Sequence, residues 1–154
     1  MPAREGSPHE AARYTTCMIG ILIIAHASYG EALVSSASHV LGHSPARVAH
    51  LGMTVREDPD AMLRKAKDLV RRLDEGDGVL ILTDILGGTP ANIATLLAVR
   101  GRVEAVAGVN LPMLVRSLTY RNEPLATLVQ KAVSGGQEGV LHVVPEIQNA
   151  DRRD

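Results

Sequence analysis

A histidine and an aspartate each stand at the point where an apolar segment ends. His26 follows the apolar run 19–25, and Asp84 follows the run 79–83. An imidazole can act as a nucleophile and form a covalent intermediate, and a carboxylate beside one ring nitrogen fixes the tautomer and frees the other nitrogen. If the two runs are neighbouring parallel strands, both side chains reach one edge of the sheet. A histidine at a strand end is also common as an ordinary structural residue, so the prediction depends on the pair.

A turn and a helix start follow Asp84 directly. They read Gly87-Gly88-Thr89-Pro90, and a helix N-terminus offers unpaired N–H groups with a partial positive charge. The glycines let an anion approach the backbone, and Thr89 carries a hydroxyl that can donate to a phosphate oxygen. Thr-Pro also starts many helices that bind nothing. In combination with the histidine and the acid, the segment favours a phosphoryl group carried on His26.

The elements that must position these residues alternate along the chain. Apolar runs predict strands near 18–25, 47–52, 79–83, 103–109 and 140–144, and helices are expected near 29–41, 59–73, 89–99, 113–120 and 124–133. This alternation is typical of an α/β sheet with right-handed crossovers. We expect a flavodoxin-like three-layer α/β/α sandwich with a mostly parallel sheet of order 2-1-3-4, whose ligands lie at the carboxyl ends of the strands.

Composition narrows the classes of function. The chain has 154 residues, a net charge of −1 and neither Phe nor Trp, so it lacks aromatic platforms for nucleic acid. The single cysteine, Cys17, excludes an internal disulfide or a multi-cysteine zinc site, and no apolar run approaches the roughly 20 residues of a membrane span. We expect a cytoplasmic protein with a flexible extension over 1–17, one domain over 18–144 and a flexible tail over 145–154.

Two further pairs of residues are weaker candidates. His39 and His43 are four apart and could bind a metal, although Gly42 should end the helix between them and no third ligand is evident. Arg116 and Arg121 follow the fourth predicted strand and could receive an anionic partner, or simply be solvated. We therefore expect no metal and no cofactor.

The chain resembles the IIA proteins of the mannose class in the bacterial phosphoenolpyruvate-dependent sugar phosphotransferase system. The resemblance covers about residues 18–143. The matching stretches are Ile23-Ile24-Ala25-His26, Asp84-Ile85-Leu86-Gly87-Gly88-Thr89-Pro90-Ala91-Asn92 and Gly108-Val109-Asn110-Leu111-Pro112-Met113-Leu114.

This resemblance implies specific roles and partners. His26 would accept a phosphoryl group from the phosphocarrier protein HPr and pass it to a IIB partner on a separate chain, with Asp84 orienting the histidine. Phosphate would contact Gly87, Gly88 and Thr89. The resemblance also assigns partner binding to Asn110, Pro112 and Met113.

The resemblance further implies a homodimer in which the strand 140–144 adds antiparallel to the partner's sheet. A membrane would be reached only indirectly, through a permease complex. The role could be sugar uptake or regulation. Two alternatives remain at this point: the phosphotransfer subunit of a dihydroxyacetone kinase system, and a non-catalytic flavodoxin-like binding or scaffold domain.

Overall fold

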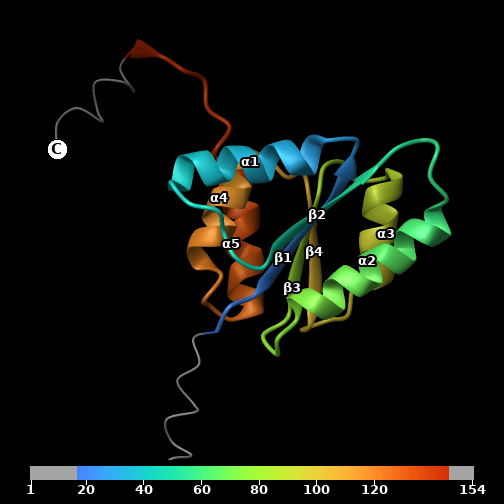
Figure 1. The fold of residues 1–154 in the computed structure, drawn as a ribbon. Coiled ribbons are helices and arrows are strands. Elements are labelled where there is room, and N and C mark those ends of the chain that lie inside the picture. The colour runs from blue at the N-terminus through green and yellow to red at the C-terminus, as the bar shows by residue number, and fades with distance from the viewer. Residues whose placement is uncertain (1–16, 146–154) are drawn as a thin grey trace, which may run out of the picture.

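Four parallel strands form the centre of the molecule (Figure 1). In this computed structural model, which describes residues 17–145, the sheet order is β2-β1-β3-β4. The strands are β1 (Gly20–His26), β2 (Val48–Met53), β3 (Val79–Thr83) and β4 (Val103–Ala107). β1 pairs in parallel with both β2 and β3, and β3 pairs in parallel with β4. The predicted strand order is confirmed.

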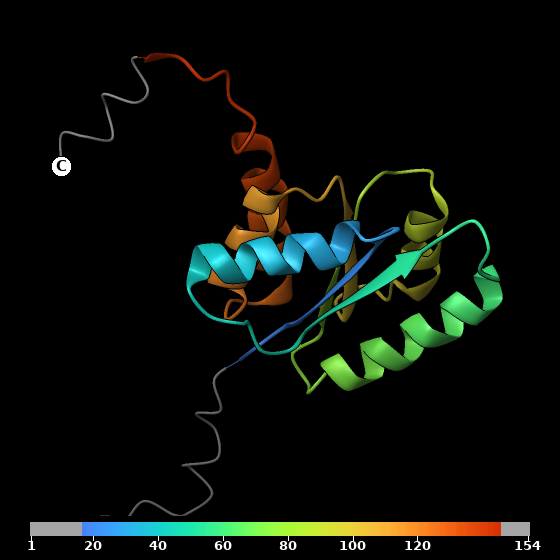
Figure 2. The same cartoon turned by 45° about the horizontal axis from the view of Figure 1, so that its top comes forward.

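Helices cover both faces of the sheet (Figures 1 and 2). The helices are α1 (Tyr29–Leu41), α2 (Pro59–Leu73), α3 (Thr89–Leu97), α4 (Leu111–Tyr120) and α5 (Leu125–Glu138). Ile21 and Ile23 of β1 belong to the core under α1, α4 and α5, whereas Leu22 and Ile24 belong to the core under α2 and α3. Because successive side chains of a strand point to opposite faces, β1 is apolar throughout and supports both layers. The three-layer α/β/α sandwich is therefore confirmed.

Local sequence sets several helix boundaries. Asp58 caps α2 by accepting the backbone N–H of Asp60 at 3.3 Å, and Pro59 occupies the first turn. Gly42 ends α1 in the left-handed conformation with φ of 78°, which glycine adopts without a steric penalty. Across residues 17–145, none of the helices has both the length and the apolar character that crossing a membrane requires.

The end of α5 differs from the prediction. The helix expected over 124–133 is too short, because α5 continues through Gly135 and Gly136 to Glu138. Both glycines face α4 at close range: a Cβ on Gly135 would lie 2.9 Å from the Arg116 side chain, and one on Gly136 would lie 2.7 Å from Met113. The glycines are therefore needed for close packing of two helices, and this packing offsets their low helix propensity.

The predicted fifth strand is not formed in the single chain. Residues 140–144 follow α5 without strand structure, and in Figures 1 and 2 this segment leads away from the sheet. Val140, Leu141 and Val143 are 75%, 67% and 72% exposed. A β-strand needs a neighbouring strand to pair its backbone groups, and no strand of the described residues pairs with this segment. The predicted extension and tail lie almost entirely outside the described residues.

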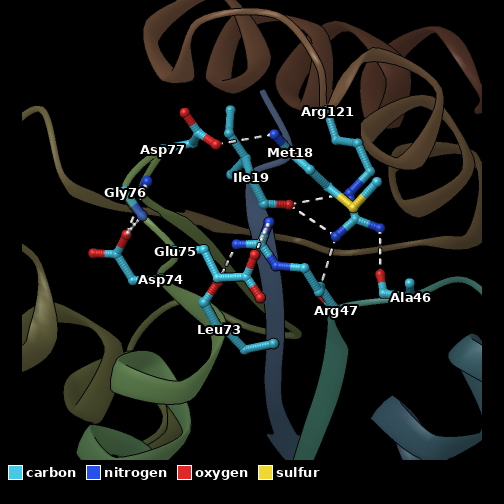
Figure 3. A network of polar contacts seen from close by, with 11 residues as sticks. Met18, Ile19, Ala46, Arg47, Leu73, Asp74, Glu75, Gly76, Asp77 and Arg121 are labelled. Carbon is cyan, nitrogen blue, oxygen red and sulfur yellow. Dashed lines mark hydrogen bonds and ion pairs between the residues drawn. The ribbon is translucent and has the colours of Figure 1, made fainter. Parts of the chain in front are cut away.

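A buried arginine joins three segments at the amino end of the sheet (Figure 3). Arg121 is 5% exposed. Its Nε and Nη2 donate to the Ile19 carbonyl at 3.0 and 2.8 Å, Nη1 donates to Ala46 at 2.6 Å, and Nη2 also donates to Arg47 at 2.9 Å. Burial, followed by the nearby charge of Arg47, lowers the pKa of Arg121 to about 10. The suggestion that Arg121 receives an anionic partner is wrong, because backbone carbonyls already occupy its guanidinium.

We predict that Arg121→Met lowers the free energy of unfolding by about 2–4 kcal/mol, because buried carbonyls lose charged donors. Chemical denaturation monitored by circular dichroism measures the change. The control is Arg72→Met, which removes an ion pair to Asp68 from a side chain that is 72% exposed, and which should change stability by less than about 0.5 kcal/mol. Equal effects of the two substitutions would contradict the bracing role of Arg121.

Candidate active site

His26 and Asp84 meet at the carboxyl edge of the sheet. Their strands are direct neighbours, with Ile24 of β1 beside Thr83 of β3. One carboxylate oxygen of Asp84, Oδ2, lies 2.7 Å from His26 Nδ1 and accepts the His26 backbone N–H at 2.8 Å. The other oxygen accepts the Ile85 N–H at 2.9 Å. The predicted meeting of the imidazole and the carboxyl group is confirmed, and the carboxylate holds the histidine at both its backbone and its ring.

The charged form of Asp84 is favoured in the fold. Its side chain is 16% exposed, and burial by itself would raise the pKa of the carboxyl group. Hydrogen bonds from the backbone and ring of His26 and from the Ile85 N–H outweigh burial and hold the pKa of Asp84 below its ordinary value. The carboxylate is therefore ionised at neutral pH and can only accept hydrogen bonds.

This contact decides which ring nitrogen is free. Since the carboxylate accepts, Nδ1 of His26 must carry the hydrogen, and in the neutral ring Nε2 then holds the lone pair. The His26 side chain is 51% exposed, so the ring is accessible. This geometry leaves Nε2 of His26 available as a nucleophile.

Glycines bring the start of α3 against the imidazole. Gly87 has a φ of 89°, which a side chain would strain. A Cβ on Gly88 would lie 2.9 Å from His26 Cε1 and 3.4 Å from Nε2, so a larger residue would push into the ring. Gly88 is the N-cap of α3 and has no side chain to occupy the N–H groups of the first turn. These groups are suited to an anion.

A cavity of about 520 Å³ opens beside His26. Thr89 lies on this cavity, and its side chain is exposed. The connection between β2 and α2 forms the opposite wall, which was not predicted from the sequence. The expected strand order could have indicated this wall. It places β2 beside β1, so the residues that follow β2 lie at the same edge of the sheet as His26. The lining residues are His26, Ala27, Met53, Thr54, Val55, Glu57, Pro59, Thr89 and Pro90.

The three residues assigned to partner binding lie at the start of α4. Asn110 caps that helix: its Oδ1 accepts the Met113 N–H at 2.9 Å, and its Nδ2 donates to the Gly136 carbonyl at 3.1 Å. Met113 is only 4% exposed, whereas Pro112 is exposed. These contacts explain Asn110 and Met113 as packing residues, and their binding of a partner stays a prediction.

The two histidines considered as a metal pair are separated by the end of α1. His39 lies in the last turn of α1, and His43 follows the left-handed Gly42. Within residues 17–145, His, Cys, Asp and Glu side chains form no group of three or more that could hold a metal ion.

The fold and the site define a flavodoxin-like α/β protein with a histidine–carboxylate pair at the carboxyl edge of its sheet. Residues 20–133 match the family described as PTS system fructose IIA component, EIIA-man. The chain belongs to this family. Membership does not favour the dihydroxyacetone kinase subunit or the scaffold domain.

Similar sequences support the same family assignment. The chain is 35% identical to the PTS system mannose-specific EIIAB component of Escherichia coli strain K12. The aligned 125 residues cover 79% of this chain. The match spans 38% of that relative's length. The PTS system fructose-specific EIIA component of Bacillus subtilis strain 168 is 32% identical over 105 residues, covering 68% of this chain and 71% of its own.

Solved structures share the architecture. The phosphotransferase system component EIIA from Streptococcus agalactiae is 27% identical, with a TM-score of 0.73 over 81% of this chain and 97% of its own. The mannose/sorbose specific IIA subunit from Enterococcus faecalis has a TM-score of 0.74 over 82% of this chain and 96% of its own. At 22% identity, this second likeness concerns the fold alone.

We predict that the stability contributed by Asp84 depends on pH. Because folding lowers its pKa, the contribution is fully present above the unfolded value of about 4 and is lost as pH falls through the folded value. The difference in unfolding free energy between the wild type and Asp84→Asn should therefore shrink from pH 6 to pH 3. Urea denaturation at each pH measures it, with Asp68→Asn on α2 as the matched control. A difference that stays constant over this range would contradict selective stabilisation of the carboxylate.

Proposed function

We propose that the protein is a phosphoryl relay of the sugar phosphotransferase system, with His26 as the acceptor. The observation that carries the proposal is the 2.7 Å contact between His26 Nδ1 and Asp84, which leaves Nε2 as the nucleophile. The donor is the phosphohistidine of HPr, and the next acceptor is a histidine of a IIB partner. Family membership supports this assignment.

The transfer step follows from the free lone pair. Nε2 of His26 forms a bond to phosphorus while the phosphorus–nitrogen bond of the donor breaks, and its electron pair returns to the donor's imidazole. Positive charge develops on the His26 ring as the bond forms, and the carboxylate of Asp84 stabilises this charge through Nδ1–H. The second transfer, to the IIB partner, reverses these bond changes at His26.

The phosphoryl oxygens need compensation for their negative charge, since such transfers depend mainly on positioning and electrostatics. The N–H groups at the start of α3 and the hydroxyl of Thr89 are suited to this role. Gly88 lies against the His26 ring and leaves room for a bound phosphoryl group. We assign phosphate contact to Gly87, Gly88 and Thr89.

We further propose a homodimer built by strand exchange. β4 is an edge strand of the four-stranded sheet, so its outer backbone groups can pair with another chain. The exposed apolar segment 140–143 supplies a strand of suitable composition. Antiparallel pairing of this segment with the partner's β4 would cover the open edge of β4 and bury the apolar side chains of the segment.

We predict that phosphoenolpyruvate, enzyme I and HPr together place one acid-labile, base-stable phosphate on the protein. His26→Ala should abolish this label, because the nucleophile is lost, whereas His39→Ala on α1 should retain it. Mass spectrometry after acid and base treatment measures the label. Persistence of the label in His26→Ala would show that the acceptor is wrong, and absence of label from the wild type would contradict the relay.

The same assay tests the role of Asp84. Asp84→Asn keeps a hydrogen-bond acceptor but loses the charge, so transfer to His26 should slow by about tenfold or more. Circular dichroism checks that the variant is folded. Transfer at the wild-type rate would exclude Asp84 from the chemistry.

We predict that the wild type sediments as a dimer and that Leu141→Asp/Val143→Asp sediments as a monomer. The carboxylates would have to be buried beside β4, which is costly for unpaired charges. Analytical ultracentrifugation at micromolar concentration measures both. Val40→Asp, at a residue of α1 that is 59% exposed, is the control and should remain dimeric. A monomeric wild type, or a dimeric double variant, would contradict strand exchange.

A further inference from the structure

The turn that carries His26 is strained and needs support. Ala27 has a φ of 48°, a left-handed conformation that costs a residue with a side chain roughly 1–2 kcal/mol. Its N–H donates to the Met53 carbonyl at 2.8 Å, which fixes the turn on the β2 side. Ser28 precedes α1 but makes no capping hydrogen bond through its side chain. The start of α1 must therefore be held by another contact.

Tyr29 makes that contact. It is the first residue of α1, three positions after His26, and its hydroxyl donates to the Val109 carbonyl at 2.7 Å. Val109 lies on the other side of β3, in the connection between β4 and α4. The phenol thus joins the His26 turn to a segment far away in the sequence.

The segment that Tyr29 reaches is itself bonded to the end of β3. The Val109 N–H donates to the Thr83 carbonyl at 2.9 Å, and the Gly108 N–H donates to the Asp84 carbonyl at 3.1 Å. Asp84 in turn holds the ring of His26 through its side chain. A closed loop of hydrogen bonds therefore runs from His26 to Asp84, through residues 108–109 to Tyr29, and back along the chain to His26.

From this loop we infer that Tyr29 is a positioning residue for His26, an inference that rests on the proposed phosphoryl relay. The hydroxyl fixes the start of α1 relative to Asp84, and this keeps Nδ1–H of His26 aligned with the carboxylate. Without the hydroxyl, the start of α1 loses its bond to Val109. The α1 side of the turn can then shift relative to Asp84, although Ala27 stays bonded to Met53 and Asp84 stays bonded to Gly108. The Nδ1 contact then weakens, and the ring spends more time in the other tautomer or in other orientations.

Tyr29→Phe isolates this effect, because it retains the ring and removes only the hydroxyl. Tyr120→Phe is the matched control: Tyr120 ends α4, its ring lies beneath the Lys131 ammonium at 4.5 Å, and in the described part of the chain its hydroxyl makes no hydrogen bond that the substitution would remove. Both tyrosines are similarly exposed, at 41% and 37%. Thermal melting of all three proteins checks that they are folded at the assay temperature.

Two measurements test the inference. ¹⁵N NMR at pH 8, with the His26 signals assigned by their loss in His26→Ala, measures the fraction of rings that carry hydrogen on Nδ1. This fraction should fall in Tyr29→Phe and stay unchanged in Tyr120→Phe. Steady-state transfer from phospho-HPr should show a kcat that is about two- to tenfold lower in Tyr29→Phe, as expected for one lost hydrogen bond, with an unchanged KM for HPr.

The outcomes separate this inference from the proposed function. An Nδ1–H fraction in Tyr29→Phe equal to that of the wild type would overturn the positioning role, and so would an unchanged kcat. If the wild type accepts no phosphate, the relay fails, and the NMR comparison alone decides whether Tyr29 orients the ring. If the relay works, a fall in the Nδ1–H fraction together with a lower kcat, in Tyr29→Phe only, supports the inference. If the relay fails, the fall in the Nδ1–H fraction alone supports it.

Discussion

The structure depends on one carboxylate that holds a histidine at two points. Asp84 accepts hydrogen bonds from both the backbone N–H and Nδ1 of His26, and this is possible only because β1 and β3 are adjacent and parallel. The same contacts keep the acid ionised and leave the second ring nitrogen free. The charge of Asp84 and the availability of Nε2 therefore both follow from the adjacency of these two strands. Gly88 completes this arrangement, because only a residue without a side chain lets the start of α3 approach the ring so closely.

Much of this arrangement was predictable from the sequence. The apolar runs that end at His26 and Asp84 are long and β-branched, which indicates buried parallel strands, and the carboxyl ends of neighbouring strands necessarily meet. Helix starts such as Asp58-Pro59 and stops such as Gly42 carry local signals, because their backbone groups are satisfied by nearby residues. Local signals of this kind need no knowledge of the remainder of the fold.

Features that depend on distant contacts were not predictable. Gly135 and Gly136 look like a helix end, but α4 packs so closely that it requires them inside α5. Arg121 looks like a solvated cation, yet three carbonyls from the amino end of the sheet surround it. The hydroxyl of Tyr29 bonds to a residue 80 positions away. No pattern along the chain encodes these pairings, and within residues 17–145 the segment 140–144 pairs with no strand.

The central claim is that Nδ1 of His26 donates its hydrogen to Asp84, so that Nε2 is the nitrogen that accepts the phosphoryl group. The most direct measurement is ¹H–³¹P and ¹⁵N NMR of the protein phosphorylated through HPr, which identifies the ring nitrogen bonded to phosphorus. The account predicts that phosphorus is attached to Nε2 and that Nδ1 retains its hydrogen beside Asp84. Phosphorus attached to Nδ1 would contradict it, because that nitrogen could not then donate to the carboxylate.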